Sequence, residues 1–324
     1  MRNILVVRSG ALGDGLLTIP ALAALRTRWP EAHLTLIGPR TLLPFASASR
    51  LAGTVLAIED EAGLAVLSDG GPKPWWANAE LAVVWLQRWR EVAQRLERWG
   101  CARVLGGPSL PAAEELGHVA DHLFRALRED AIGPSYPRRP LVVPDHAATE
   151  AKDWWRRHMA VTLSPVIALH PGSGGLRKCW PADRYLTLAQ RLLDGGAAVV
   201  ICLGPAEAAT AARWRTFAAG RSAIALALNL DLAVLAGILQ HCSCFVGNDA
   251  GVTHLAAALG VPTVAIFGPT DPQRWQPVGR SVTVLRDPAW AEATPPTQLD
   301  PWRLTPLDVE QAGMAVLMAL QPRR

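Results

Sequence analysis

Apolar and polar residues form regular blocks along the first forty positions. The apolar run ILVV from Ile4 is followed by the glycine-rich stretch SGALGDG, the helical pattern LLTIPALAALRTRWP and a second apolar run, AHLTLIG. This order predicts a strand, a loop, a helix and another strand. Two strands joined through a helix in this way pair in parallel.

The same order recurs less distinctly up to about residue 130. We expect strands at Val55–Ile58, Leu81–Trp85 and Ala102–Leu105, and helices at Arg88–Trp99 and Glu114–Leu127. Residues 131–147, AIGPSYPRRPLVVPDHA, contain four prolines and little periodicity. They are the best candidate for a linker.

The alternation restarts after this segment. Strand-like runs begin at residues 166 (VIALH), 197 (AAVVICLG), 222 (SAIALA), 243 (SCFVG) and 262 (PTVAIFG), with helical stretches between them. Residues 222–240 are the most membrane-like, but Asn229 and Asp231 interrupt them, which favours a strand, a turn and a helix. The pattern predicts two successive α/β domains of the doubly wound type, residues 1–140 and 141–305, followed by a last helix from Pro306.

Composition supports two cores and a mild preference for acidic partners. The chain has 324 residues, 50% of them hydrophobic and 19% charged, which is more than one core usually organises. A net charge of +4 favours nucleotide-sugars, phosphorylated glycolipids or an anionic membrane surface. The basic residues are scattered and form no nucleic-acid motif, so we expect no nucleic-acid partner.

The cysteines and the first residues bear on the compartment. Five cysteines without a CxxC spacing predict reduced thiols and no zinc site. Met1 leads within three residues into the first apolar run, without the longer apolar region of a signal peptide. We therefore expect a cytoplasmic protein, with peripheral contact to the inner face of the membrane as an open alternative.

Two glycine-containing motifs follow predicted strands of the second domain. In HPGSGGLRKCWP, the glycines around Gly174 let backbone N–H groups approach a ligand and Lys178 adds a cation, as in a phosphate cradle. The alternative is a flexible turn with a solvated lysine, and the spacing is not that of a P-loop. In GNDAGVTHLAAALGVP, from residue 247, Ala250 and Gly251 leave a helix N-terminus open to phosphate.

The polar residues of that second motif allow two interpretations. Asn248 or Asp249 suits a helix cap. Because a carboxylate repels a diphosphate, Asp249 otherwise suits sugar or ribose hydroxyls. His254, one turn on, is either a core histidine or a ligand contact.

Two further acids follow strands. The glycines of SGALGDG run in the reverse order of the dinucleotide fingerprint, and no acid ends the second strand, which disfavours a nicotinamide cofactor. Asp14 is the only acid in this loop and suits a general base for an acceptor hydroxyl, or a helix cap before Leu16. Glu207 suits ribose hydroxyls, or it is an ordinary first-turn glutamate.

Taken in order, three segments resemble glycosyltransferase family 9, the ADP-heptose:lipopolysaccharide heptosyltransferases and their relatives. These segments are RSGALGDGLLTIPALAALR, HPGSGGLRKCWP and FVGNDAGVTHLAAALGVPTVAIFGPTDP. The resemblance spans nearly the whole chain. It implies a GT-B architecture, with two Rossmann-like domains facing a central cleft, the acceptor on the first, the nucleotide-sugar on the second, and helix 306–324 crossing back to the first.

The resemblance also implies roles for single residues. Asp14 matches the proposed catalytic base of the family, and Lys178 matches the lysine at the donor phosphate. Donor contacts are further implied for Ser173, Gly174, Glu207, Asp249, Gly251 and His254, and for Ala250, which stands where the family often has Thr.

These roles imply inverting transfer of heptose or a similar sugar from a nucleotide diphosphate-sugar to a hydroxyl of a glycolipid or other glycan. An ADP-linked donor is expected. No DxD motif is present, so we expect no obligatory metal or other cofactor. The alternatives are a GT-B-type sugar-nucleotide epimerase and a non-catalytic nucleotide-sugar binding module.

The tryptophan-rich segment 73–99 leaves one more choice open. Trp85, Trp89 and Leu96 fall near one helical face, which predicts core packing. An interfacial membrane or glycolipid surface is the alternative.

Overall fold

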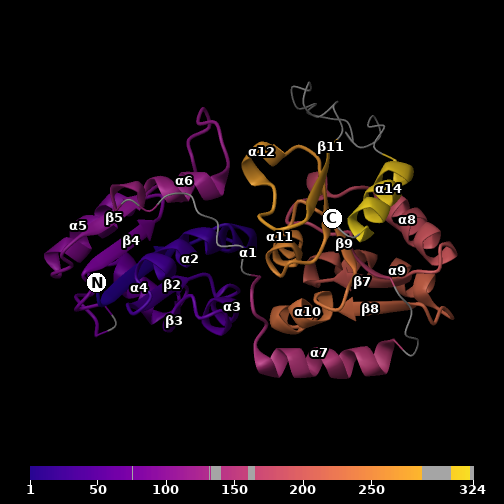
Figure 1. Ribbon diagram of the computed structural model, residues 1–324, viewed down its shortest axis with the longest axis horizontal. Coiled ribbons are helices and arrows are strands. Elements are labelled where there is room, and N and C mark those ends of the chain that lie inside the picture. The colour runs from indigo at the N-terminus through magenta and orange to yellow at the C-terminus, as the bar shows by residue number, and fades with distance from the viewer. Residues whose placement is uncertain (75, 131, 133–139, 160–164, 287–307, 322–324) are drawn as a thin grey trace. The chain divides into compact units, whose positions relative to one another are not determined.

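The computed structural model describes residues 1–324 except 75, 131, 133–139, 160–164, 287–307 and 322–324. The chain divides into two compact units, Met1–Val143 and Pro144–Arg324 (Figure 1). Each unit has its own parallel sheet and its own cluster of buried hydrophobic residues. The α/β class with two doubly wound, Rossmann-like sheets is thus confirmed.

The first unit contains a five-stranded parallel sheet in the order β3-β2-β1-β4-β5. Its strands are β1 (Asn3–Arg8), β2 (His33–Gly38), β3 (Thr54–Ala57), β4 (Leu81–Trp85) and β5 (Val104–Gly107). In the central strand, Val6 lies opposite Leu36 of β2 and Val83 of β4. All of β4 is buried, as expected where helices cover both faces of a parallel sheet.

The helices of the first unit match the predicted ones only in part. They are α1 (Leu12–Leu16), α2 (Ile19–Arg28), α3 (Leu43–Ala48), α4 (Glu61–Leu67), α5 (Trp89–Arg98), α6 (Val119–Arg125) and the 3-10 turn η1 (Arg128–Asp130). The helix predicted at Arg88–Trp99 is found there, the one predicted at Glu114–Leu127 is shorter, and residues 43–48 and 61–67 form helices that were not predicted. The predicted single helix after the first glycine loop is two helices, α1 and α2. Pro20 lies in the first turn of α2, where a residue without an N–H is tolerated.

The tryptophan-rich segment packs into the core of the first unit. Trp85 is fully buried, and its Nε1–H donates to the Leu123 carbonyl at 3.2 Å. Trp76 is buried as well and stacks on Trp99 with ring centroids 6.4 Å apart. Together with the buried Leu96, these contacts show core packing for this part of the segment.

The second unit contains a six-stranded parallel sheet in the order β11-β10-β9-β6-β7-β8. Its strands are β6 (Val166–His170), β7 (Ala198–Leu203), β8 (Ile224–Leu228), β9 (Cys244–Asn248), β10 (Thr263–Phe267) and β11 (Val282–Arg286). The first five match the predicted runs, whereas β11 was not predicted. Its residues are half-buried at the edge of the sheet, and the alternation of Val282, Thr283 and Val284 was the available signal.

Helices cover this second sheet, and the last of them belongs to its core. They are α7 (Asp145–His158), η2 (Leu176–Lys178), α8 (Ala182–Asp194), η3 (Pro205–Thr210), α9 (Ala211–Ala218), α10 (Leu232–Leu239), α11 (Gly251–Ala258), α12 (Pro272–Trp275) and α14 (Val309–Leu320). Helix α14 packs against α8 and buries Ala312 and Val316 in the core of the second unit. The crossing of residues 306–324 to the first domain stays a prediction.

The segment 222–240 has the predicted strand, turn and helix. After β8, Asn229 adopts a positive φ of 48°. Asp231 then caps α10, its Oδ1 accepting from the Ala233 N–H at 2.8 Å. Within the described ranges, no helix has both the length and the apolar character needed to cross a membrane.

The strand orders place the candidate motifs at two equivalent points. In the first sheet the order reverses between β1 and β4, and in the second between β6 and β9. Ligands of doubly wound sheets bind at such switch points, outside the carboxyl ends of the strands. SGALGDG follows β1, HPGSGG follows β6 and NDAG follows β9, so the fold brings all three to these points.

The five cysteines are free thiols. Cys101 is buried in the first unit, and Cys202, Cys242 and Cys244 are buried in the second. Burial raises the pKa of Cys202 and of Cys244 to about 12, because an apolar environment disfavours the thiolate.

Candidate functional site

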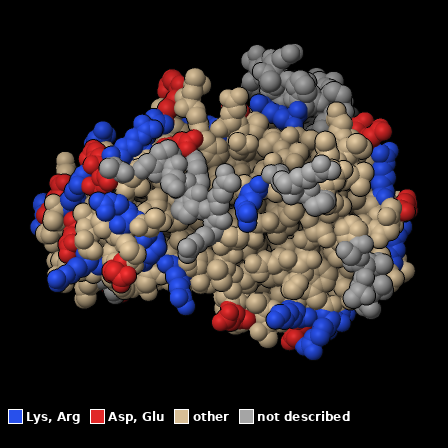
Figure 2. Space-filling model, viewed as in Figure 1, with Lys and Arg blue, Asp and Glu red and all other residues tan. Residues whose placement is uncertain are grey.

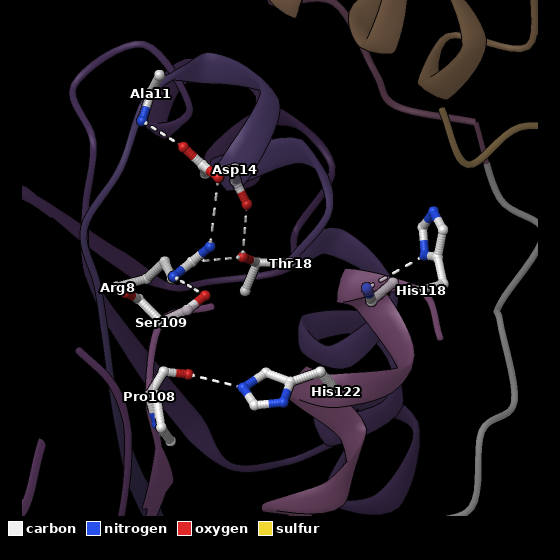
Figure 3. Close-up of polar contacts among 9 residues, drawn as sticks. Arg8, Ala11, Asp14, Thr18, Pro108, Ser109, His118 and His122 are labelled. Atoms are coloured by element: carbon white, nitrogen blue, oxygen red, sulfur yellow. Dashed lines mark hydrogen bonds and ion pairs between the residues drawn. The ribbon is translucent and has the colours of Figure 1, made fainter. Parts of the chain in front are cut away.

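In the first unit, Asp14 lies beside a buried arginine (Figure 3). Its Oδ2 accepts from the Ala11 N–H at 3.0 Å, and its Oδ1 lies 3.9 Å from Nη2 of Arg8. The Arg8 side chain is fully buried and is held by the Thr18 hydroxyl at 3.2 Å and the Ser109 carbonyl at 2.9 Å. Asp14 therefore has one oxygen tied to the backbone and one facing a fixed cation.

Asp14 has a structural role at the start of α1 and is also partly accessible to solvent. It is the third residue of α1 and bonds the N–H of the residue that precedes that helix, so it caps α1 rather than a helix beginning at Leu16. Its side chain is 24% exposed, which leaves the carboxylate accessible. Gly10 lies close to it, with a φ of +134° and room for no Cβ, which would lie 2.6 Å from the Asp14 Cβ.

In the second unit, Asp249 is the centre of a polar cluster. Its Oδ2 accepts from Lys178 Nζ at 2.8 Å and from the Thr270 hydroxyl at 2.7 Å, and its Oδ1 lies 3.7 Å from His254 Nε2. Its backbone carbonyl accepts from the Ser173 hydroxyl at 2.7 Å. Burial raises the pKa of Asp249, but contacts with His254, Lys178 and Thr270 outweigh it and lower the pKa to about 2.

The helix that follows has an uncapped N-terminus. Helix α11 begins at Gly251, its N-cap is Ala250, and no side chain caps it. The interpretation of Asn248 or Asp249 as a cap is therefore wrong, and backbone N–H groups at this end are open to an anion. His254 is 5% exposed, and its buried Nδ1 has no hydrogen-bond partner within the described part of the chain.

The loop of residues 171–180, called the glycine loop below, brings the predicted donor residues to this cluster. Ser173 and Lys178 both contact Asp249, although they lie more than 70 positions from it in the sequence. The Lys178 side chain is 36% exposed, so its ammonium group is oriented by Asp249 and still reaches solvent. Gly174 is in open space, with nothing within 4 Å of a Cβ added there.

Glu207 joins the same site through backbone contacts. Its Oε2 accepts from the Gly204 N–H at 2.7 Å, which is the contact expected of a first-turn glutamate. Its Oε1 occupies the space that a side chain at Gly172 would fill. The carboxylate is therefore packed against the glycine loop.

Three residues of these networks were not predicted as site residues. Arg8 ends the first apolar strand, and a charge at that position was the available signal. Thr270 follows β10 in GPTDP, and a hydroxyl after a strand is a weak signal alone. Asn248 was considered only as a helix cap, whereas it is fully buried and bonds the glycine loop.

The charged side chains of the first unit (Figure 2) and the possible metal ligands of the described ranges are distributed without a marked cluster of either kind. On the face in Figure 2, Lys and Arg side chains of the first unit lie interspersed with Asp and Glu, so the net positive charge forms no single large patch there. Among the residues that the structure describes, no three His, Cys, Asp or Glu side chains gather in a group that could hold a metal ion.

Sequence and structure comparisons give a consistent result. Residues 138–299 match glycosyltransferase family 9 (heptosyltransferase). Lipooligosaccharide heptosyltransferase 2 of Haemophilus ducreyi is 30% identical over 165 residues, which is 49% of this chain and 47% of the relative. The aligned part of this chain covers about half the length of this relative and of a second heptosyltransferase 2.

Two solved structures share the fold over almost the whole chain. A glycosyl transferase family 9 protein from Veillonella parvula has a TM-score of 0.77 at 18% identity, covering 98% of this chain and 97% of that one. The E. coli ADP-heptose lps heptosyltransferase II has a TM-score of 0.73 at 18% identity, covering 98% and 99%.

Proposed function

The chain belongs to glycosyltransferase family 9, and from this premise we propose that it transfers a sugar from a nucleotide diphosphate-sugar to a hydroxyl group of a glycan acceptor. The observation that carries the proposal is the cluster of Ser173, Lys178 and Asp249 at the reversal point of the second sheet. There an oriented ammonium group lies beside a glycine loop and an uncapped helix. Such an arrangement suits a diphosphate.

We assign the donor to the second unit. Lys178 and the N–H groups at the start of α11 stabilise the charge that develops on the leaving nucleoside diphosphate. The Asp249 carboxylate, ionised because of its low pKa, holds the ammonium group in place by a hydrogen bond of 2.8 Å. Glu207, Ala250, Gly251 and His254 surround the donor, and the name of the E. coli neighbour favours an ADP-linked heptose.

We assign the base to the first unit. Asp14 accepts the proton of the acceptor hydroxyl while that oxygen attacks the anomeric carbon. The bond between the anomeric carbon and the donor phosphate oxygen breaks in the same displacement, so the configuration inverts. No metal is assigned to this reaction. The name of the curated relative favours a lipooligosaccharide or similar glycolipid as acceptor.

Nucleotide binding tests the donor assignment. ADP at about 100 times its dissociation constant should stabilise the protein by about 2.7 kcal/mol, seen as a rise in melting temperature. We expect this rise in the wild type and in Asp14→Asn, but not in Lys178→Ala. If no nucleotide shifts the melting temperature of the wild type, the donor assignment fails.

Turnover tests the reaction. With an ADP-sugar and a panel of glycan acceptors, nucleotide release should depend on acceptor and be lost in Asp14→Asn. Release without any acceptor, with isomerised sugar, would support the epimerase instead. Tight nucleotide binding that is unaffected by Asp14→Asn and accompanied by no turnover would support the binding module.

A further inference from the structure

Asn248, the last residue of β9, is fully buried and uses its whole hydrogen-bonding capacity. Its Nδ2 donates to the carbonyls of Pro171 at 2.9 Å and Gly172 at 3.1 Å. Its Oδ1 accepts from the Trp180 N–H at 2.9 Å and from the Tyr185 hydroxyl at 3.1 Å. A carboxamide has two N–H donors and two acceptor lone pairs, and here all four have partners.

These partners lie at both ends of the glycine loop. Pro171 and Gly172 open the loop after β6, and Trp180 closes it. The groups proposed to meet the donor phosphates, Ser173 and Lys178, lie between them. The carboxamide therefore holds the two ends of the loop against the end of β9.

The next residue holds the middle of the same loop. Asp249 accepts from the Ser173 hydroxyl and from the Lys178 ammonium group. The pairing of β6 with β9, in which His170 lies opposite Gly247, brings the two strand ends together. Asn248 and Asp249, which follow one another in the sequence, thus fix the position of the glycine loop at both ends and in the middle.

Gly172 links the position of the glycine loop to η3, the element that contains Glu207. Its carbonyl is held by Asn248, and the space beside its Cα is filled by Glu207 Oε1. A shift of Gly172 would therefore move the Glu207 carboxylate as well.

We propose that Asn248 is the positioning residue of the donor site, acting through the glycine loop on Ser173, Lys178 and Glu207. It is buried and does not meet the donor itself. The inference rests on the proposed function, since it assumes that the second unit binds a nucleotide diphosphate.

Asn248→Asp is the most selective test of this role. The substitution is nearly isosteric and keeps an acceptor for Trp180 and Tyr185, but a carboxyl group has one hydrogen to donate when neutral and none when ionised, whereas the carboxamide donates two, to Pro171 and Gly172. At least one of the two loop carbonyls therefore loses its donor and faces an oxygen instead. We expect a rise of at least about tenfold in the Kd for ADP and in the KM for an ADP-sugar, with the KM for the acceptor within about threefold of the wild type.

Tyr185→Phe is the matched control. It removes only the hydroxyl that donates to Asn248 Oδ1, and the two bonds to the loop carbonyls remain. Its Kd for ADP should stay within about threefold of the wild type, even if the melting temperature falls. A merely structural role for Asn248 would lower stability in both variants and leave the Kd of each folded variant unchanged.

Calorimetric titration with ADP measures these Kd values. Circular dichroism first shows that each protein is folded. If Asn248→Asp does not fold, the smaller neutral variant Asn248→Ser replaces it with the same expectation. A folded Asn248 variant that binds ADP as tightly as the wild type overturns the inference and leaves the proposed function intact. If the wild type binds no nucleotide, the proposed function and this inference both fail.

Discussion

At the residue scale, Asp249 shows how one nearly buried side chain holds several polar groups together. Its side chain is 7% exposed, yet it is ionised, because Lys178, Thr270 and His254 all face it. A buried carboxylate without such partners would be neutral at physiological pH. The cluster therefore holds the Lys178 ammonium group in one orientation by burying one anion, the Asp249 carboxylate.

The ionisation of Asp249 predicts a specific loss of stability in acid. Its pKa is lowered to about 2 in the folded protein, against about 3.9 in an unfolded chain. The stabilisation is therefore fully present above about pH 4 and is lost as the pH falls through about 2. Between pH 6 and pH 2, the wild type should lose about 2 kcal/mol more of its unfolding free energy than Asp249→Asn does.

Urea unfolding at a series of pH values measures this difference. Asp183→Asn is a suitable control, because that carboxylate is 79% exposed in an ion pair with Arg213 and exposed pairs contribute little. The control should follow the wild type. Parallel curves for wild type and Asp249→Asn would contradict the low pKa.

At the scale of elements, the glycine loop packs against η3, because Gly172 lies against Glu207. Gly172→Ala would place a Cβ on Glu207 Oε1, whereas Gly174→Ala meets nothing within 4 Å. We expect Gly172→Ala to lower the unfolding free energy by about 1–3 kcal/mol. Gly174→Ala, in the same loop, should change it by less than about 0.5 kcal/mol.

A double-mutant cycle identifies the cause. Glu207→Ala removes the overlapping oxygen, so Gly172→Ala should cost less in that background, with a coupling of about 0.5–3 kcal/mol. Additive effects of the two substitutions in urea unfolding would show that Gly172 is sensitive for another reason.

The predictability of the elements follows from their burial. β4 and β6 have the bounds expected from the sequence, because strands covered on both faces appear as continuous apolar runs. β11 was not recognised, although the alternation of Val282, Thr283 and Val284 is typical of a half-buried strand. The division between α1 and α2 was also missed, although Pro20 marks the beginning of the second helix.

The site was predictable only as far as its motifs are local. Lys178 and Asp249 could be named from their own loops, and the fold shows that they form an ion pair. The bonds of Asn248 to Trp180 and of Arg8 to Ser109 span 68 and 101 positions. No pattern in a single sequence specifies such pairs, because they depend on which strands become neighbours.

At the scale of the whole molecule, the two units divide the residues of the proposed reaction. Asp14 belongs to the unit 1–143, and the proposed donor residues belong to the unit 144–324. Because the second unit has its own core, we expect a fragment of residues 144–324 to fold and to bind ADP with a Kd within about threefold of the full chain.

Titration calorimetry on the fragment and on its Lys178→Ala variant tests this expectation, with circular dichroism as the check of folding. A folded fragment that binds ADP at least tenfold more weakly than the full chain would show that the first unit contributes to the donor site.

The buried thiols give each unit its own reporter of opening. Cys202 and Cys244 lie in strands of the second unit with a pKa of about 12, and Cys101 is buried in the first. Only the thiolate reacts readily with alkylating reagents, so these cysteines are labelled when their surroundings open. Cys179, which is less buried than these three, serves as the internal reference. Peptide masses from timed alkylation would therefore follow the unfolding of the two units separately, with the natural cysteines as the only labelling sites that are needed.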